Sequence, residues 1–404
     1  MQVNALSHGF SGVSSWVPAG VGHAHLASAF LQPMPAVRIP SHILNNARAH
    51  SRLFAVDFFD DKKGQADFQP DDFQLDDLRK PSMQGLTRED VLSAESRLQP
   101  FSEDLSTPTP LIYSRELSLL AGEGKKVYLK LENMRPTHSF KIRGALNAIL
   151  ANTERGRIFQ QVVAASQGNH AQGVALASQL TEKEALIFMP ENADPTKIKQ
   201  TQSFGAEVKL VGQSLDDAID AAKSYAEENG AFWLHPYDDQ DVIAGQGTVG
   251  LEILDQNEKI DTIIVPAGGG GLLSGITLAC PDQEVIGVQL EAMPSMAKSL
   301  LADHVQPVPH QKTIAGGIAV GTAGTLGVEV CKKAHTQMHL VSEDEVQAAL
   351  CYLLSEAGLK VEGAGSVSVI PLMRGDSIPG DRIVLVISGS NIAAEKLAHC
   401  TMRE

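Results

Sequence analysis

Beyond about residue 85, short apolar runs alternate with amphipathic segments along the chain. The runs are rich in β-branched residues and apolar at consecutive positions, which is typical of strands buried on both faces. The segments Leu215–Glu228, Glu343–Ala357 and one from Thr87 through Leu98 predict helices. This alternation predicts an α/β fold of open, mostly parallel sheets flanked by helices. The predicted strands are Val127–Leu131, Val162–Ala165, Ala185–Phe188, Val208–Val211, Thr262–Val265, Val285–Val288 and Ile383–Ile387.

Composition narrows the class of protein. The chain has 404 residues, 43% of them apolar, which suffices for two ordinary domains with a substantial core. The formal net charge of −15 argues against a nucleic-acid partner, because such binders need a cationic face. No apolar run approaches the roughly 20 residues of a membrane-spanning helix, so we expect no membrane partner.

The four cysteines, Cys280, Cys331, Cys351 and Cys400, lie far apart in the sequence and form no C-x-x-C pair. This spacing argues against a disulfide scaffold and against a structural zinc site. A reducing compartment is the natural interpretation. We expect no metal site.

The first 56 residues differ from the rest, since they contain seven serines and three arginines but no Asp, Glu or Lys. Such acid-poor leaders resemble organellar transit peptides, although an extension that carries no targeting signal fits equally well. Residues 57–80 turn acidic and predict a solvated linker. We therefore expect residues 1–84 to be a largely disordered or targeting segment. The expected location is cytoplasmic, or the plastid or mitochondrial matrix if the leader is a transit peptide.

The strongest local signal is the run Gly268, Gly269, Gly270 and Gly271, which joins the strand at Thr262–Val265 to an apolar helix beginning near Leu272. Glycines let bare N–H groups crowd around one ligand, and a helix N-terminus adds partial positive charge. Together they predict a phosphate site. The spacing G-x-G-x-x-G is absent, but Glu291 lies about 20 residues downstream, which keeps a nicotinamide oxidoreductase open as an alternative.

Two further strand ends carry polar turns. Ser166, Gln167, Gly168, Asn169 and His170 follow the strand at Val162–Ala165 and precede a helix that runs through Leu180. Their N–H groups suit a second anion such as a carboxylate, although a capped turn explains them equally well.

Ser388 follows the strand at Ile383–Ile387, at the sheet edge where α/β proteins bind ligands. An ordinary turn explains Ser388 as well. Nothing in its local sequence distinguishes Lys141 from a surface lysine.

These segments, in this order, resemble the threonine dehydratase and serine dehydratase branch of the fold-type II pyridoxal-phosphate enzymes. The resemblance spans roughly residues 85–400. Its motifs are Ser139-Phe-Lys-Ile-Arg-Gly-Ala145, Ser166 to Gly173, Asp241-Val-Ile-Ala-Gly-Gln-Gly-Thr248, Gly268 to Leu272, Gly287-Val-Gln289 with Pro294-Ser-Met296, and Ser388-Gly-Ser-Asn391.

The resemblance implies roles for individual residues. Lys141 is implied as the Schiff-base lysine and Phe140 as its neighbour beside the ring. Asn169 is implied as the partner of the ring hydroxyl, and Ser388 as the partner of the ring nitrogen. The backbone of Gly268, Gly269, Gly270, Gly271 and Leu272 is implied to bind the cofactor phosphate, and Ser166, Gln167, Gly168, Asn169 and His170 the substrate carboxylate.

The resemblance also implies an architecture. The expected fold has two domains and is similar to the tryptophan synthase β chain. Residues 85–155 with 236–404 would form a large cofactor-binding domain, and residues 156–235 a small one. Homodimers or homotetramers are implied.

The implied activity is deaminating dehydration of L-threonine, and of L-serine, to 2-oxobutanoate or pyruvate and ammonia, with pyridoxal 5'-phosphate as cofactor. A role in isoleucine biosynthesis would follow. Serine racemase and hydroxyaspartate dehydratase are alternatives, as is a sensor that binds the cofactor without turnover. Racemisation is disfavoured because Gln167 and Gln289 stand where racemases of this fold have an acid-base serine and a metal-binding acid.

Overall fold

The computed structural model describes residues 85–302 and 304–401. The predicted targeting segment and acidic linker within residues 1–84 lie outside the described residues.

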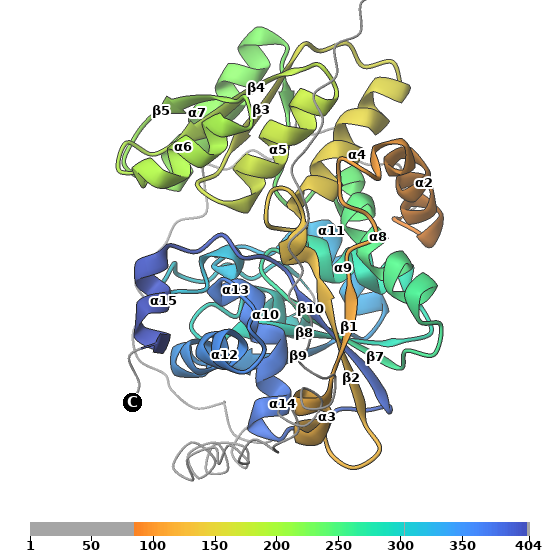
Figure 1. Ribbon diagram of the computed structural model, residues 1–404. Coiled ribbons are helices and arrows are strands. Elements are labelled where there is room, and N and C mark those ends of the chain that lie inside the picture. Colours follow the sequence, from red (N-terminus) through yellow and green to blue (C-terminus); the bar gives the residue numbers. More distant parts are fainter. Residues whose placement is uncertain (1–84, 303, 402–404) are drawn as a thin grey trace, which may run out of the picture. The chain divides into compact units, whose positions relative to one another are not determined.

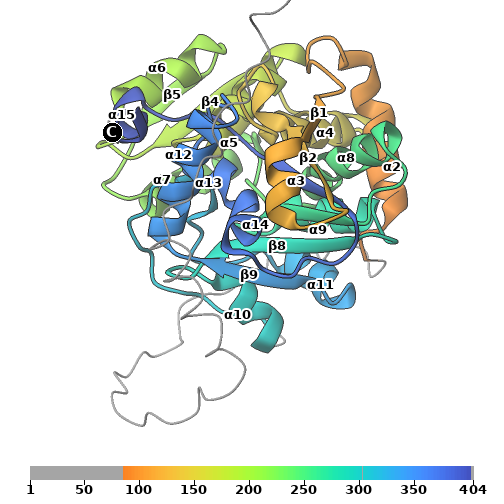
Figure 2. The ribbon, with the colours of Figure 1, turned by 60° about the horizontal axis from the view of Figure 1, so that its bottom comes forward.

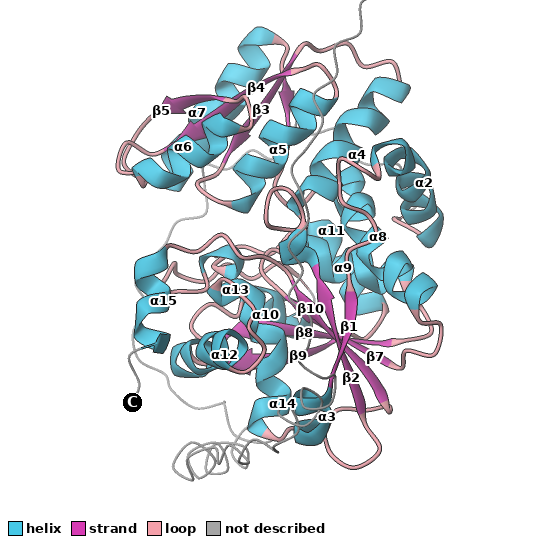
Figure 3. Ribbon diagram, in the orientation of Figure 1, coloured by secondary structure: helices cyan, strands magenta, loops and turns pink. Residues whose placement is uncertain are grey.

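Among the described residues, ten strands form two sheets, drawn in magenta in Figure 3. The larger sheet has the order β1-β2-β10-β7-β8-β9 and the smaller one β5-β4-β3-β6. The strands are β1 Leu111–Ser114, β2 Lys126–Leu131, β3 Gln161–Ala165, β4 Glu184–Met189, β5 Glu207–Leu210, β6 Phe232–Trp233, β7 Thr262–Pro266, β8 Glu284–Leu290, β9 Gln337–Val341 and β10 Arg382–Ile387.

The pairing confirms the predicted parallel α/β class. Every pair of neighbouring strands is parallel except β1 with β2. All seven predicted strands are present, within two residues at either end. The sequence pattern missed β1, β6 and β9. Strand β6 has only two residues, and the other two are short and largely exposed or half-buried.

Helices cover both sheets (Figure 1). The first six are α2 Arg88–Leu98, α3 Arg115–Ala121, α4 Lys141–Glu154, α5 Asn169–Leu180, α6 Pro195–Ser203 and α7 Leu215–Asn229. The others are α8 Gln240–Gln256, α9 Gly271–Ala279, α10 Ser295–Ala302, α11 Thr325–Lys333, α12 Glu343–Ser355, α13 Gly363–Ser366, α14 Ile370–Arg374 and α15 Ala394–Thr401. Short 3₁₀ turns include η2 Glu132–Met134 and η3 Gly316–Ile318.

The two helices predicted after the glycine turn and after the polar turn are confirmed as α9 and α5. The other three predicted helices are confirmed as α2, α7 and α12, and each of these begins with a reciprocal cap. Thr87, Ser214 and Ser342 stand at the N-caps, and an acidic residue three positions later bonds back to each of them. This arrangement satisfies two of the N–H groups that a helix leaves unpaired at its start.

Alternate side chains along the strands of the larger sheet point into two separate cores. Ile264 and Leu385 face a core shared with α3, α12 and α14. Their neighbours Ile263 and Val384 face a core shared with α2, α8 and α9 on the other side. Figure 2 shows these two sets of helices around the sheet. Since side chains alternate along a strand, an apolar run is what a sheet covered on both faces requires.

The smaller sheet is built in the same way. Val162 and Ile187 pack with α4, α5 and α6, whereas Val163 and Leu186 pack with α7. Helix α4 packs against both α5 and α8, so it joins the elements around the two sheets. The strands of the smaller sheet lie within residues 156–235. The domain boundaries remain a proposal.

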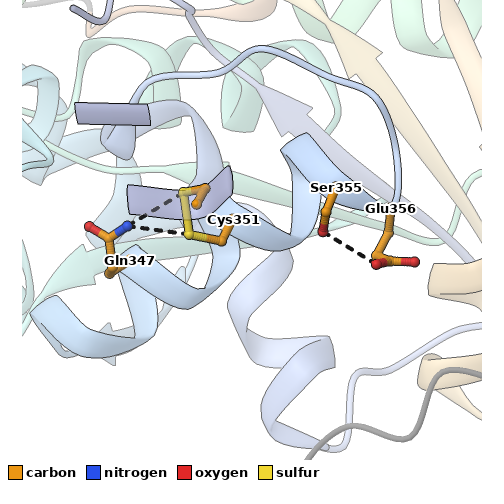
Figure 4. Close-up of a disulfide and its surroundings, with 5 residues drawn as sticks. Gln347, Cys351, Ser355 and Glu356 are labelled. Carbon is orange, nitrogen blue, oxygen red and sulfur yellow. Dashed lines mark hydrogen bonds between the residues drawn. A yellow bond between two sulfur atoms is a disulfide. The ribbon is translucent and has the colours of Figure 1, made fainter. Parts of the chain in front are cut away.

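The structure corrects the expectation for two cysteines. Cys351 on α12 and Cys400 on α15 form a disulfide although 49 residues separate them, as Figure 4 shows. The prediction was wrong because spacing along the chain does not reveal that α12 and α15 pack together. Cys280 and Cys331 are buried free thiols. Within the described ranges, no helix has the length and apolar character to cross a membrane.

Candidate active site

The glycine turn lies at the carboxyl end of β7, and its carbonyl groups point into the protein. The carbonyl of Gly268 accepts from Gln289 Nε2 at 3.3 Å, that of Gly269 from the Gly324 N–H at 2.9 Å, and that of Gly270 from the Ser274 N–H at 2.8 Å. Gly270 adopts a φ of +98°, a conformation that residues with side chains rarely take. The turn thus leaves its N–H edge for another partner.

The start of α9 supplies the matching electrostatics. Gly270 is the N-cap, and no side chain caps the first N–H groups of this nine-residue helix. A helix N-terminus attracts anions through these groups and through its dipole. A Cβ on Gly269 would lie 2.4 Å from the ring of Tyr237, so the turn has no room for a side chain. These residues fit a phosphate held by backbone donors, as the sequence predicts.

Lys141 is the first residue of α4, and its side chain turns inward. Its Nζ donates to the carbonyl of Pro236 at 2.6 Å and lies 5.3 Å from the centre of the Phe140 ring. Burial lowers the pKa of Lys141 to about 8. The local sequence gave no sign of this, because the walls around the amine come from distant parts of the chain.

The segment His235–Tyr237 connects this amine to the glycine turn. Pro236 accepts the bond from Lys141, and the next residue, Tyr237, packs against Gly269 and Gly271. The amine and the turn therefore contact adjacent residues of one segment. Sequence reasoning missed Tyr237, whose hydroxyl donates to the carbonyl of Thr322 at 2.9 Å, because it lies in no recognisable motif.

Ser388 contacts Phe140, the residue before the same lysine. It follows β10, the neighbour of β7 in the sheet, so both strands end at one edge. The carbonyl of Ser388 accepts from the Phe140 N–H at 3.3 Å, and Ser139 forms a bridge with Gly389. The Ser388 hydroxyl is buried and donates to the Ala364 carbonyl at 3.5 Å.

The second polar turn approaches from the smaller sheet. The start of α5 packs on the start of α4, where a Cβ on Gly173 would lie 3.0 Å from the Lys141 backbone. Ser166 Oγ accepts from the Gly168 N–H at 3.1 Å, which braces the turn, and Gln167 is half-buried beside it. The structure thus brings this turn near Lys141.

His170 lies inside the protein. Its Nε2 is 3.1 Å from the carbonyl of Leu234, and burial together with the charge of Lys141 lowers its pKa to about 3. The imidazole is therefore neutral at ordinary pH and its ring packs in the interior. Only its backbone N–H fits the anion-binding role predicted for the turn.

Asn169 holds a fixed amide at the start of α5. Its Oδ1 accepts from Asn391 Nδ2 at 2.7 Å, and its Nδ2 donates to Glu362 Oε1 at 2.5 Å. Asn391 in turn donates to the Thr137 carbonyl. Both ends of the amide are therefore held in place. Since Nδ2 carries two N–H groups and the bond to Glu362 uses one, the other can bind a ligand.

Glu362 is a second residue that sequence reasoning missed. It is the N-cap residue of α13, and burial raises the pKa of its carboxyl to about 7, against opposing effects of Asn169, Lys197 and Lys396. A single acid within the otherwise uncharged stretch Val361–Val369 is the signal that could have found it.

A buried ionic cluster lies beneath the start of α4. It consists of Lys130, Glu132, Arg135, Arg143 and Glu252, each at most 8% exposed. Arg143 bonds both oxygens of Glu132, at 2.9 and 2.8 Å, and Arg135 adds a bond at 3.1 Å. Since Arg143 is two residues from Lys141, the cluster fixes the position of the lysine's helix.

Comparisons with known proteins show the family of the chain. A family model described as pyridoxal-phosphate dependent enzyme matches residues 103–389. The L-threonine ammonia-lyase of Thermotoga maritima is 44% identical over 313 residues, which cover 76% of this chain and 76% of that protein.

Two solved structures share the fold. The processed form of threonine deaminase isoform 2 from Solanum lycopersicum has a TM-score of 0.71 and 32% identity, and the match covers 78% of this chain and 88% of that one. A maize serine racemase has a TM-score of 0.72 and 29% identity, over 78% of this chain and 97% of that one.

Proposed function

The chain belongs to the pyridoxal-phosphate dependent enzymes, in their threonine dehydratase branch, and we propose that this lyase deaminates L-threonine to 2-oxobutanoate and ammonia. The observation that carries the proposal is the Lys141 amine, sheltered and bonded to Pro236 next to the residue that packs on the glycine turn. L-serine, with pyruvate as product, is the second proposed substrate.

The residues described above have complementary proposed tasks. The N–H groups of Gly268 to Leu272 bind the cofactor phosphate, the Ser388 hydroxyl faces the ring nitrogen, and Asn169 binds the ring hydroxyl. The bound cofactor supplies an electron sink for the carbon that loses its proton. The turn from Ser166 to His170 binds the substrate carboxylate.

Lys141 is the proposed acid-base group. With a pKa of about 8, roughly a tenth of its Nζ is neutral at pH 7, far more than for an ordinary lysine, and this form can accept the Cα proton of the substrate. A hydroxyl at Ser388 carries no charge, unlike a carboxylate, so it leaves the ring nitrogen without a permanent proton. This favours elimination over transamination.

Serine racemase activity is a weaker candidate, which the similar fold of the maize enzyme suggests. Gln167 has no titratable proton with which to act as an acid-base group. The oxygen of Gln289 accepts from the N–H groups of Met296 and Ala297, and its nitrogen donates to Gly268 and Ser295. Gln289 therefore braces α10 and the glycine turn.

The decisive assay is 2-oxo acid formation from L-threonine, L-serine and 3-hydroxyaspartate. Lys141→Ala should lose at least about a thousandfold in turnover. Lys199→Ala, which removes an exposed lysine on α6, is the matched control and should keep full activity.

Borohydride treatment followed by peptide mass spectrometry gives an independent readout. Lys141 should be the modified lysine, and the yellow colour should disappear. Full activity in Lys141→Ala would refute the proposed chemistry, and a yellow protein inert toward all three amino acids would instead indicate a sensor. Size-exclusion chromatography with light scattering tests the proposed homodimer or homotetramer.

A further inference from the structure

Glu362 is a sheltered carboxyl group without a cationic hydrogen-bond partner. Within residues 85–302 and 304–401, its side chain accepts one bond, from Asn169 Nδ2 at 2.5 Å, and forms no ion pair. An ionised carboxylate in such a place is normally paired with a positive group, because burying it alone is costly. Its position therefore calls for an explanation other than packing.

The carboxylate contacts Asn169 and also Gly389, the residue after Ser388, so it lies next to both residues proposed to bind the polar edge of the cofactor ring. Its Oε1 approaches Gly389 so closely that a Cβ there would be within 2.4 Å, and the Glu362 N–H donates to the Gly389 carbonyl at 3.1 Å. Gly389 directly follows Ser388, and a Cβ on Gly389 would also lie 3.1 Å from Asn169 Nδ2. Glu362, Asn169 and Gly389 therefore meet at this edge.

The surrounding elements leave the carboxyl free to titrate. Gly317 of η3 and Ala364 of α13 bring no charge, and neither do Ser388 and Asn391 after β10. The charges that act on it are the exposed amines of Lys197 on α6 and Lys396 on α15. At the start of α5, Asn169 is uncharged and His170 is neutral.

We propose that Glu362 is a positioning residue that couples its own proton to the cofactor's ring hydroxyl through the amide of Asn169. This inference rests on the proposed cofactor role of Asn169. It adds an acid that none of the predicted site residues includes.

The coupling follows from hydrogen-bond chemistry. An ionised Glu362 accepts from Asn169 Nδ2 in a charge-assisted bond, which fixes the amide and aims its second N–H at the ring oxygen. The bond from Asn391 to Asn169 Oδ1 prevents the amide from flipping. A protonated Glu362 accepts more weakly and relaxes this constraint. The pKa of about 7 places the change near neutral pH.

The test is a pH titration of the visible absorption spectrum of the substrate-free holoenzyme. We expect a transition with a midpoint near the carboxyl's pKa in the unaltered protein. Glu362→Gln should abolish the transition or move its midpoint by more than about one pH unit. Glu362→Asp, which keeps an acid, should retain a transition with a changed midpoint. Glu228→Gln, on the exposed face of α7, is the control and should change nothing.

Asn169→Ala separates the relay from a general effect of charge. In this background, replacing Glu362 by Gln should no longer move the midpoint, since coupled residues are non-additive. An unchanged midpoint in Glu362→Gln would overturn the proposal. An effect of Glu362→Gln that persists in full in the Asn169→Ala background would also overturn it. The same holds if Glu362→Gln and Glu362→Asp have equal spectra and both variants have lost the cofactor.

The spectrum is recorded without substrate, so its outcome is independent of the threonine assay. Failure of the titration would leave the proposed substrate untouched. Failure of 2-oxo acid formation would leave the link between Glu362 and Asn169 intact.

Discussion

Two glutamates contact the first turns of neighbouring helices, Glu132 that of α4 and Glu362 that of α5, and their environments are opposite. Glu132 accepts bonds from Arg135, Arg143 and the hydroxyl of Thr109, the last at 2.6 Å. Glu362 accepts a single bond from an uncharged amide. Glu132 is fully buried and Glu362 is half-buried, but only the first carboxylate is charge-compensated.

The difference separates a group that maintains the fold from one suited to function. A compensated buried ion is locked in one protonation state, and removing a partner leaves an opposing charge stranded. Carboxylates outweigh the effect of burial at Arg143 and raise its pKa. An uncompensated acid can exchange its proton near neutral pH, which is typical of functional sites. The same isosteric substitution should therefore have opposite consequences at the two positions.

The largest expected effect is that of Glu132→Gln. It leaves Lys130, Arg135 and Arg143 with only Glu252 as a buried counter-charge. We expect the free energy of unfolding to fall by about 3–5 kcal/mol, as for other broken buried pairs. Chemical denaturation monitored by circular dichroism measures it. A loss below about 1 kcal/mol would mean that the cluster does not stabilise the fold.

The next effect reverses with pH. Because folding raises the Glu362 pKa from 4.5 to about 7, its contribution is fully present below pH 4.5 and is lost as pH rises through 7. Glu362→Gln mimics the protonated form, so it should gain stability relative to the unaltered protein above pH 7. The gain should be at most about 3 kcal/mol. Thermal melting of both proteins between pH 5 and 8.5 tests the sign, and a gain confined to low pH would contradict it.

A smaller effect is expected from Cys400→Ser. The disulfide ties α15 to α12, and α15 carries Lys396, one of the two cations that act on Glu362. We expect a loss of about 1–2 kcal/mol, below the usual range for a disulfide, because α15 is short. Thiol titration of the unfolded, unreduced protein should give two thiols before the change and three after it. Four thiols before the change would disprove the disulfide.

The smallest effect is expected from Lys197→Met. Lys197 lies on the exposed surface of α6, and its charge lowers the pKa of Glu362. Its removal should therefore raise the midpoint of the spectral titration by a few tenths of a pH unit. High salt should abolish the difference, because exposed charges are screened. Lys199→Met on the same helix is the control. A larger shift that persists in salt would indicate that the site is drier than its geometry implies.

The fold could be predicted wherever a run of apolar residues enters both cores. Runs such as Thr262–Val265 and Ile383–Ile387 are confirmed because each successive side chain has an apolar layer to enter. The strands β1, β6 and β9 escaped prediction since their pairing partners, rather than their own composition, make them strands.

The candidate site was predictable in its turns but not in its side-chain environment. Glycines and polar residues at strand ends mark where ligands bind, and the structure brings those turns together. No local pattern shows that Lys141 points inward, that His170 packs on Leu234, or that Glu362 meets Asn169 across 193 residues of sequence.

The sequence by itself determined the α/β class, the position of the glycine and polar turns at strand ends, and the family, because these depend on periodicity and on short motifs that act locally. Tertiary structure alone decided which thiols form a disulfide, which glutamate is paired with cations and which lysine amine is shielded from solvent. Protonation and redox state depend on neighbours within a few ångströms, and folding recruits those neighbours from remote parts of the chain.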